Sequence, residues 1–456
     1  QYVSSPATNS PTGTITIEVW TKPNIGACSS GSVYGNVVYK PNAYIIYCNS
    51  GNWYANTGNG SSMGTAKVFP YPVNEGEWVH LAIAISGSNL FMFYNGQLVE
   101  TGVAQTVTAN SSQWYVGSQG SANTYLNGYV DEFRIWKSIR TESQIQSDMV
   151  SNPTLTDANL ITYFDFNEGS GNAAYDRDAL YISPSTMQLV SNSGNISWAA
   201  IESATVSGNY TTVQFPRSII TQKGGWKIPA QVKSAMTLIV SGGGGGGVNS
   251  GAGGAGGGAL KGVAAVKSTK GPAKIQVGMG GYGGLKTNAT SGGRNGFASI
   301  LSTADSTVNA QVNGGAGGYA HWTDNPCGAG ATASTGTING GSVQAGYSGI
   351  SDTTTYVGGA GGALAVYQAA GNNGGAGFTS SVFNGAKLFG GGAGSGSYSN
   401  SAVGGMGGGD NGNAYGGRGA GSVTSGDAGI ALTGNGGGGA GNSSCTVIAS
   451  PGGSGT

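Results

Sequence analysis

The chain has 456 residues, of which 89 are glycine, and its 19 Lys and Arg residues balance its 19 Asp and Glu residues. Zero net charge excludes the basic surface by which proteins hold nucleic acids or anionic membranes, and no apolar run approaches the roughly 18 residues that cross a bilayer. The length predicts two or three domains. The chain begins with Gln1 rather than Met, so we expect a processed chain, by removal of a signal peptide or by another truncation.

Residues 1–203 are predicted to be all-β, because apolar and polar residues alternate there in short runs. Asn95-Gly96, between two of these runs, predicts a two-residue hairpin turn, since both turn positions need positive φ. A short helix is expected over 141–149, with Thr141 as its cap. Strands are expected at 14–22, 43–48, 78–85, 90–94, 114–116 and 129–136. Many short strands separated by turns are typical of a sandwich.

Three motifs in this half resemble the laminin-G-like, concanavalin-type jelly roll. They are WVHL at 78–81, GYVDEFRIW at 128–136 and LITYFDFNEGSG at 160–171. The resemblance covers about 200 residues. It implies two packed antiparallel sheets, commonly a calcium ion, and a role in binding glycans or other proteins.

A calcium site implied by this resemblance would use carboxylates, because calcium prefers six to eight oxygen ligands. The candidate ligands are Asp131, Asp165, Glu168, Asp176 and Asp178. The alternative is structural: as strand neighbours, Asp131 and Glu132 would point to opposite faces, one holding a turn or a buried hydrogen bond and the other solvated.

Aromatic side chains on loops are the candidate glycan-binding residues, because sugar rings stack on aromatic faces. These are Trp53, Tyr54, Trp114, Tyr115 and Tyr125. The alternative for each tryptophan is a place in the core, which is clearly favoured for Trp20, Trp78 and Trp136 in the middle of predicted strands.

No enzyme activity is predicted. The carboxylate strand E-x-D-x-E of glucanases with this jelly roll is absent, and only His80 and His321 could serve as histidine bases. His80 lies inside a predicted strand, which favours a core or hydrogen-bonding role. The G-x-G-x-x-G strings within 244–258 lack the strand–helix context of a nucleotide site.

The four cysteines fit an extracellular protein, secreted or on a cell or virion surface. Of the three possible connectivities, Cys28–Cys48 with Cys327–Cys445 is the simplest. Six sequons are candidates for glycosylation, although a chain rich in Asn, Ser and Thr also produces sequons by chance. They begin at Asn59, Asn110, Asn195, Asn209, Asn288 and Asn442.

Residues 204–241 are predicted to form a linker and the strands that lead into the second half. The motif GWKIP at 225–229, followed by an alternating strand and oligoglycine, resembles the start of glycine-rich modules in bacterial surface proteins and phage tail-fibre adhesins.

Residues 242–456 are about one-third glycine, and the glycine runs often show a triplet, as in GGAGGY at 314–319 and GGAGGA at 358–363. A period of three matches an extended helix with three residues per turn, whose N–H and C=O groups must bond to neighbouring helices. We therefore predict a bundle of extended polyglycine-type helices with few β-strands, which resembles that of phage tail-fibre adhesins. Disorder and silk-like β stacking are the alternatives.

The expected function is a secreted, non-enzymatic structural subunit of an extracellular fibre or filament, because only 8% of residues are charged and copies of the chain would repel one another weakly. Its main partner would be copies of itself. The alternative is an adhesin of tail-fibre type that binds glycans or a receptor. Nucleic-acid binding and membrane insertion are not expected.

Overall fold

The computed structural model divides into two compact units, Gln1–Pro216 and Arg217–Thr456. The described residues are 2–4, 13–29, 31, 34–108, 110–120, 124–167, 173–177, 186–190, 203–207, 210–214, 238–247, 257–261, 273–284, 292–303, 308–318, 335–338, 341–344, 378–380, 387–389, 409–410 and 413–414. The predicted Cys327–Cys445 disulfide and the sequons at Asn195, Asn209, Asn288 and Asn442 lie outside them.

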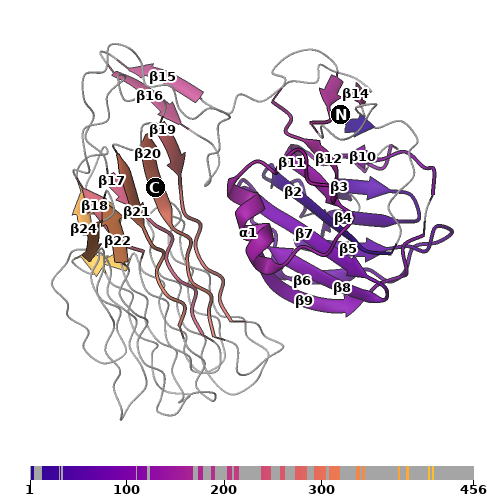
Figure 1. Ribbon diagram of the computed structural model, residues 1–456, viewed down its shortest axis with the longest axis horizontal. Coiled ribbons are helices and arrows are strands. Elements are labelled where there is room, and N and C mark those ends of the chain that lie inside the picture. The colour runs from indigo at the N-terminus through magenta and orange to yellow at the C-terminus, as the bar shows by residue number, and fades with distance from the viewer. Residues whose placement is uncertain are drawn as a thin grey trace, which may run out of the picture. The chain divides into compact units, whose positions relative to one another are not determined.

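The first unit is the predicted sandwich of two antiparallel sheets (Figure 1). One sheet has six strands in the order β12 (Leu160–Phe164), β11 (Gly128–Trp136), β2 (Ile15–Pro23), β7 (Val79–Ser86), β8 (Asn89–Tyr94) and β9 (Gln97–Val103). The other has eight, in the order β13 (Ala173–Tyr175), β14 (Thr186–Val190), β1 (Tyr2–Ser4), β10 (Tyr115–Val116), β3 (Gly35–Lys40), β4 (Tyr44–Asn49), β5 (Asn52–Thr57) and β6 (Lys67–Pro72).

The core lies between the two sheets, where alternate residues of each strand meet. Trp114 joins them: its ring centroid lies 4.6 Å from that of Tyr44 on β4 and 5.9 Å from that of Phe133 on β11. The Cys28–Cys48 disulfide holds the loop after β2 to β4, as predicted.

The predicted hairpin turn and helix are both present. Asn95 and Gly96 have φ values of 46° and 75°, which are those of a tight primed turn between β8 and β9. Helix α1 (Glu142–Val150) begins after Thr141, whose side chain forms a capping box with Gln144. Ile145 of α1 packs on Ala82, Ala84 and Phe93 of β7 and β8, so the helix covers the outer face of the six-stranded sheet (Figure 1).

Smaller strands follow the sandwich. β15 (Ser203–Ser207) pairs with β16 (Tyr210–Gln214), where part of the predicted linker lies. β17 (Leu238–Val240) pairs with β18 (Ala259–Lys261), and β19 (Ala273–Gln276), β20 (Ser299–Thr303), β21 (Asn309–Val312), β22 (Thr335–Ile338) and β23 (Gly341–Gln344) form one sheet. Two short hairpins are β24 (Phe378–Ser380) with β25 (Lys387–Phe389), and β26 (Gly409–Asp410) with β27 (Asn413–Ala414).

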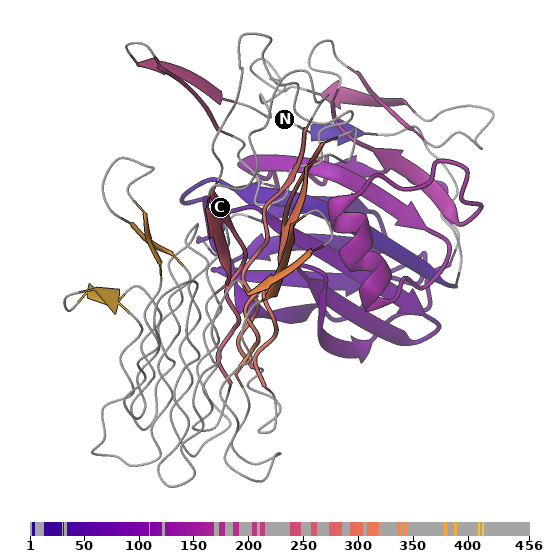
Figure 2. The ribbon, with the colours of Figure 1, turned by 60° about the vertical axis from the view of Figure 1, so that its left-hand side comes forward.

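Four extended glycine segments, at 242–246, 278–284, 292–297 and 314–318, run side by side from these strands (Figure 2). Their hydrogen bonds recur every third residue. The N–H groups of Gly242 and Gly245 donate to the carbonyls of Phe297 and Arg294, at 3.1 and 2.9 Å. The carbonyls of the same two glycines accept from the 314–318 segment, at 2.8 Å each. Backbone groups of one segment therefore bond to two neighbours, as an extended three-residue helix requires.

Glycine is required where these segments touch. A Cβ at Gly245 would lie 1.9 Å from the carbonyl oxygen of Tyr282, and one at Gly281 would lie 2.0 Å from that of Arg294. Positions with the same conflict recur three residues apart: Gly242 and Gly245, Gly278 and Gly281, Gly293 and Gly296, Gly314 and Gly317. A Cβ at Gly244, beside Gly245, would also lie 2.0 Å from the carbonyl oxygen of Ala316. The close approach of backbones thus explains the three-residue period of the sequence in this region.

Candidate functional site

The described carboxylates of the predicted calcium site are already engaged by the protein. Asp131 Oδ1 accepts the N–H of Glu132 at 2.9 Å, Asp165 Oδ1 pairs with Arg177 Nε at 2.8 Å, and Asp176 Oδ1 accepts the N–H of Tyr163 at 2.9 Å. These contacts anchor β11 and β12 and the turn that follows them.

Glu168 and Asp178, the other two predicted ligands, lie outside the described residues. Within the described part of the chain, no three His, Cys, Asp or Glu side chains gather as a metal site would require. Calcium therefore stays a prediction that depends on residues 168–178.

The expectation that Asp131 and Glu132 point to opposite faces, one of them to solvent, is wrong. The register of β11 against β2 shifts between Asp131 and Arg134, and Glu132 has a φ of 52°. This bulge interrupts the alternation of the strand. Both side chains are consequently buried.

Trp53 and Trp114 are core residues, so the expectation that they are exposed is also wrong. Trp53 of β5 is 0% exposed and Trp114 is 5% exposed. Side chains alternate along β5, so Trp53 points inward to the core and its neighbour Tyr54 points outward. Trp114 is covered because it lies between the sheets.

Tyr115 and Tyr125, two of the three remaining candidates, lie in a half-exposed group of aromatic rings on the eight-stranded sheet. The Tyr2 ring lies 5.8 Å from that of Tyr115 and 6.1 Å from that of Tyr125, with which it stacks. Tyr39 of β3 lies 6.1 Å from Tyr115. These four rings come from β1, β3, β10 and the segment before β11.

A second group continues along the same sheet. The Tyr47 ring of β4 stacks on Tyr54 of β5 at 4.9 Å and lies 5.7 Å from Tyr34, which is 46% exposed. Because Tyr44 contacts Trp114 in the core, residues 45 and 47 of β4 must point outward. Ile45 is paired with Tyr39 there and is only 6% exposed.

We name this surface the tyrosine face: Tyr2, Tyr34, Tyr39, Tyr47, Tyr54, Tyr115 and Tyr125. Sequence reasoning looked for aromatic residues on loops and missed Tyr39 and Tyr47. Two-residue alternation in the strands, with tyrosine in the polar phase, is the signal that would have found them.

Burial and neighbouring phenols favour the neutral form of three rings of the tyrosine face. Burial raises the pKa of Tyr2, Tyr39 and Tyr47, and neighbouring phenols raise it further. Tyr115 donates its hydroxyl hydrogen to Gln113 Oε1 at 3.0 Å. Flat apolar rings bordered by hydroxyl and amide groups can stack on a ligand and hydrogen-bond to its edges.

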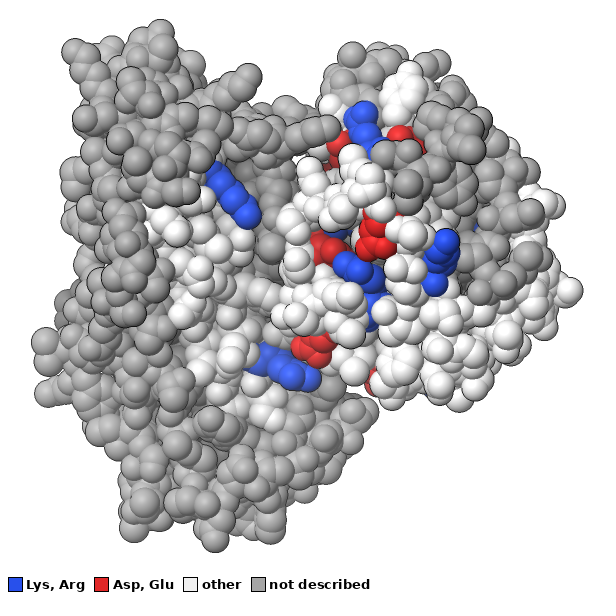
Figure 3. Space-filling view, in the orientation of Figure 1, with Lys and Arg blue, Asp and Glu red and all other residues white. Residues whose placement is uncertain are grey.

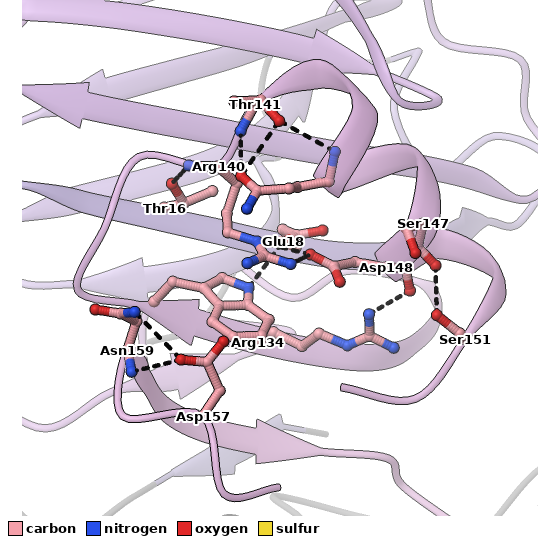
Figure 4. A network of polar contacts seen from close by, with 12 residues as sticks. Thr16, Glu18, Arg134, Arg140, Thr141, Ser147, Asp148, Ser151, Asp157 and Asn159 are labelled. Carbon is pink, nitrogen blue, oxygen red and sulfur yellow. Dashed lines mark hydrogen bonds and ion pairs between the residues drawn. The ribbon is translucent and has the colours of Figure 1, made fainter. Parts of the chain in front are cut away.

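A buried ionic network lies on the opposite sheet, beneath α1 (Figure 4). The guanidinium of Arg134 pairs with Glu132 at 2.5 Å, donates to the carbonyl of Asp148, and lies 4.9 Å from the centre of the Tyr163 ring. Arg140 pairs with the Asp148 carboxylate at 2.5 Å. The network thereby ties α1 to β11 and β12.

Glu18 and His80 form the deepest part of this network. Glu18 Oε1 accepts the indole N–H of Trp136 at 2.7 Å, and Glu18 Oε2 lies 3.5 Å from His80 Nε2. Burial raises the pKa of Glu18 to about 8, with a further rise from the Asp148 carboxylate. Burial and the nearby Arg134 hold the pKa of His80 well below its ordinary value of 6.5.

These pKa shifts predict a pH dependence of folding. The folded Glu18–His80 pair holds one proton, on Glu18, up to about pH 8, whereas the unfolded chain releases protons near 4.5 and 6.5. Both states hold one proton between those two values. Above pH 6.5 the folded state holds one proton more than the unfolded chain. The free energy of unfolding therefore falls as the pH rises towards 8, by up to ~1.4 kcal/mol per pH unit.

Urea unfolding at pH 6.5, 7.3 and 8 measures this slope. We expect Glu18→Gln to abolish it, because glutamine holds no titratable proton, while Glu100→Gln, a partly exposed control on β9, retains it. If the slope of stability against pH is unchanged in Glu18→Gln, another titratable group causes it.

The two described sequons differ. Asn59 is exposed in a turn, where its Oδ1 accepts the N–H groups of Ser61 and Ser62 at 3.0 Å each. Asn110 donates its side-chain amide to the carbonyl of Pro41 at 2.7 Å. A glycan on Asn110 would replace a hydrogen of this amide, so Asn59 is the better acceptor of the two.

Most of the described surface in Figure 3 is uncharged, with Lys, Arg, Asp and Glu side chains in small separate groups. Among the described residues, no helix has the length and apolar character needed to span a membrane.

Two family models match the chain. One, described as "Concanavalin A-like lectin/glucanases superfamily", matches residues 1–146. The other, described as "Glycine-rich domain", matches residues 220–456, which is just over half of the chain.

Individual relatives are distant. Pappalysin-1 of Mus musculus is 35% identical over 81 residues, and that of Homo sapiens is 31% identical over 80; each match covers 16% of this chain and 5% of the relative. The chain thus spans about a twentieth of their length.

Solved structures similar to this chain include a carbohydrate binding protein, described as putative, from Bacteroides ovatus. It has 14% identity and a TM-score of 0.33, covering 47% of this chain and 57% of that one. A heptameric pentraxin from Limulus polyphemus has 16% identity and a TM-score of 0.27, covering 41% and 94%.

Proposed function

Because the chain belongs to the glycine-rich domain family, and its first 146 residues to the concanavalin A-like lectin/glucanase superfamily, we propose that it is an extracellular, non-enzymatic glycan-binding adhesin. In this proposal the tyrosine face holds the glycan, and the glycine-rich unit is the rigid support that presents it.

The tyrosine face is the observation that carries the proposal. Half-exposed rings from five strands of one sheet form a surface on which sugar rings can stack. The rings contact one another at centroid distances of 4.9 to 6.1 Å, so each restricts the motion of its neighbours. A surface ordered before binding loses little side-chain entropy when a glycan binds.

An extracellular location is supported by the Cys28–Cys48 disulfide, because such bonds persist in oxidising compartments. We further propose that the three-residue lattice of the four described segments extends through 242–456 as a polyglycine-helix bundle. The backbone hydrogen bonds of those segments support this extension.

A glycan array probed with the full chain tests the adhesin. We expect Tyr47→Ala and Tyr115→Ala each to weaken binding roughly fivefold, because each removes a stacking surface worth about 1 kcal/mol. Tyr129→Ala is the matched control, since Tyr129 is 41% exposed on β11 of the other sheet. Failure to bind any glycan on a broad array would overturn the proposal.

A fibre subunit is the second candidate. The favouring observation is the backbone lattice, because extended glycine segments bond to neighbours through N–H and C=O groups that a second copy also carries. Negative-stain electron microscopy of the native protein tests this second function. Filaments would support a fibre subunit, and discrete particles would contradict it.

A further inference from the structure

A pocket lies where the sandwich is open between the edge strands β6 and β9, and its volume is about 330 Å³. Its lining combines polar side chains with two small apolar ones: Thr57, Gly64, Thr65, Lys67, Val103, Ala104 and Gln105. This volume suits a ligand the size of one sugar residue. None of these residues belongs to the tyrosine face.

Two glycines position the polar side chains of the pocket. A Cβ at Gly102 would lie 3.0 Å from Lys67 Cε, so the lysine stem lies directly across this glycine of β9. A Cβ at Gly64 would lie 2.7 Å from Gln105 Cγ. The backbone beside Gln105 is also held, because its N–H donates to Thr57 Oγ1 at 2.7 Å.

Lys67 supplies a positive charge, and no carboxylate in the described part of the chain forms an ion pair with it. The ion pairs among the described residues involve Arg134, Arg140, Arg177 and His80, and none involves Lys67. Thr65 and Gln105 add further hydrogen-bond donors at the same wall. The ammonium of this half-buried lysine, beside neutral donors, favours an anion.

The pocket also has an apolar wall. Val103, which is 75% exposed, and Ala104 form this wall at the end of β9. A ligand bound there would place its charged group against Lys67 and its hydrocarbon face against valine. An acidic sugar carries both surfaces on one ring.

We propose that this pocket binds the carboxylate of a single acidic sugar residue, of the uronic acid class, with Lys67 as its counter-ion. That the ligand is a sugar rather than another small acid rests on the proposed function, whereas the binding of an anion does not. The site is separate from the tyrosine face and would select glycans by charge.

Titration calorimetry of the full chain with glucuronate, glucose and acetate tests the proposal. We expect glucuronate to bind at least about tenfold more tightly than glucose, since its carboxylate adds a charge-assisted hydrogen bond to Lys67 that glucose lacks. We also expect it to bind more tightly than acetate, which has the carboxylate but no ring to pack against Val103. Acetate binding as tightly as glucuronate, or glucose binding as tightly, would overturn the proposal.

Lys67→Gln should reduce glucuronate affinity about tenfold, while Lys137→Gln, at an exposed lysine outside the pocket, should leave it unchanged. Gly102→Ala should also weaken binding, because the new Cβ displaces the Lys67 stem. If Lys67→Gln binds glucuronate as tightly as the native chain does, the proposed role of Lys67 in this pocket is wrong. Tyr47→Ala should retain glucuronate binding, so failure of the tyrosine face and failure of this pocket are distinguishable.

Discussion

Gly245→Ala should unfold the described glycine lattice, at a cost above about 4 kcal/mol, as expected when a core contact is overfilled and cannot relax. The new Cβ would lie 1.9 Å from the carbonyl oxygen and 2.1 Å from the carbonyl carbon of Tyr282. Backbone atoms cannot rotate away as a side chain can. The segments would have to separate, which would break the hydrogen bonds of Gly245 to Arg294 and Gly318.

Calorimetric unfolding of the full chain measures this loss. Ala316→Gly is the matched control, because position 316 belongs to the same lattice but carries a half-buried side chain in the native protein. Its expected cost is only about 0.5–1 kcal/mol, from the greater entropy of the unfolded chain. If the Gly245→Ala variant unfolds at the same temperature as the native protein, the close packing of these segments is contradicted.

Arg134→Met should destabilise the sandwich by about 3–5 kcal/mol, the range found when one partner of a buried ion pair is removed. The side chains of Arg134 and Glu132 are only 3% and 4% exposed, so the variant leaves the Glu132 carboxylate buried with the Tyr163 hydroxyl as its remaining partner. The contact of Arg134 with the carbonyl of Asp148 is lost as well, which loosens α1.

A double-mutant cycle in urea identifies the cause. Adding Glu132→Gln to Arg134→Met should recover part of the loss, because a neutral amide can still accept the Tyr163 hydrogen bond. Arg177→Met should cost less, because the side chain of Arg177 is 30% exposed. A loss below about 1 kcal/mol for Arg134→Met would mean that solvent reaches this network.

Local sequence signals predicted the elements that local chemistry determines. The positive φ of Asn95-Gly96 and the capping box of Thr141 arise within a few neighbouring residues, and both are present. The alternation of apolar residues likewise predicted the two sheets. These features depend little on how distant parts of the chain meet.

Burial on the outer faces could not be predicted in this way. Glu18 occupies the polar phase of β2, which a two-residue pattern assigns to solvent, but it is buried in the ionic network beneath α1, where it accepts the indole N–H of Trp136 (Figure 4). Trp53 and Tyr54 are adjacent aromatic residues, and only the register of β5 decides which of them faces the core. The tyrosine face was predicted only in part: Tyr54, Tyr115 and Tyr125 were candidates, but their assembly into one surface depends on strands that are distant in sequence.

The three-residue interval of the glycine segments also governs how their length can change. Removing one residue from such a segment would shift every later glycine away from the carbonyl that it contacts, and would bring a residue with a side chain to some of those contacts. Removing three would shorten the segment by one turn and keep its phase. Insertions and deletions between related chains should therefore occur in threes within the glycine runs, and in any number within the loops that join them.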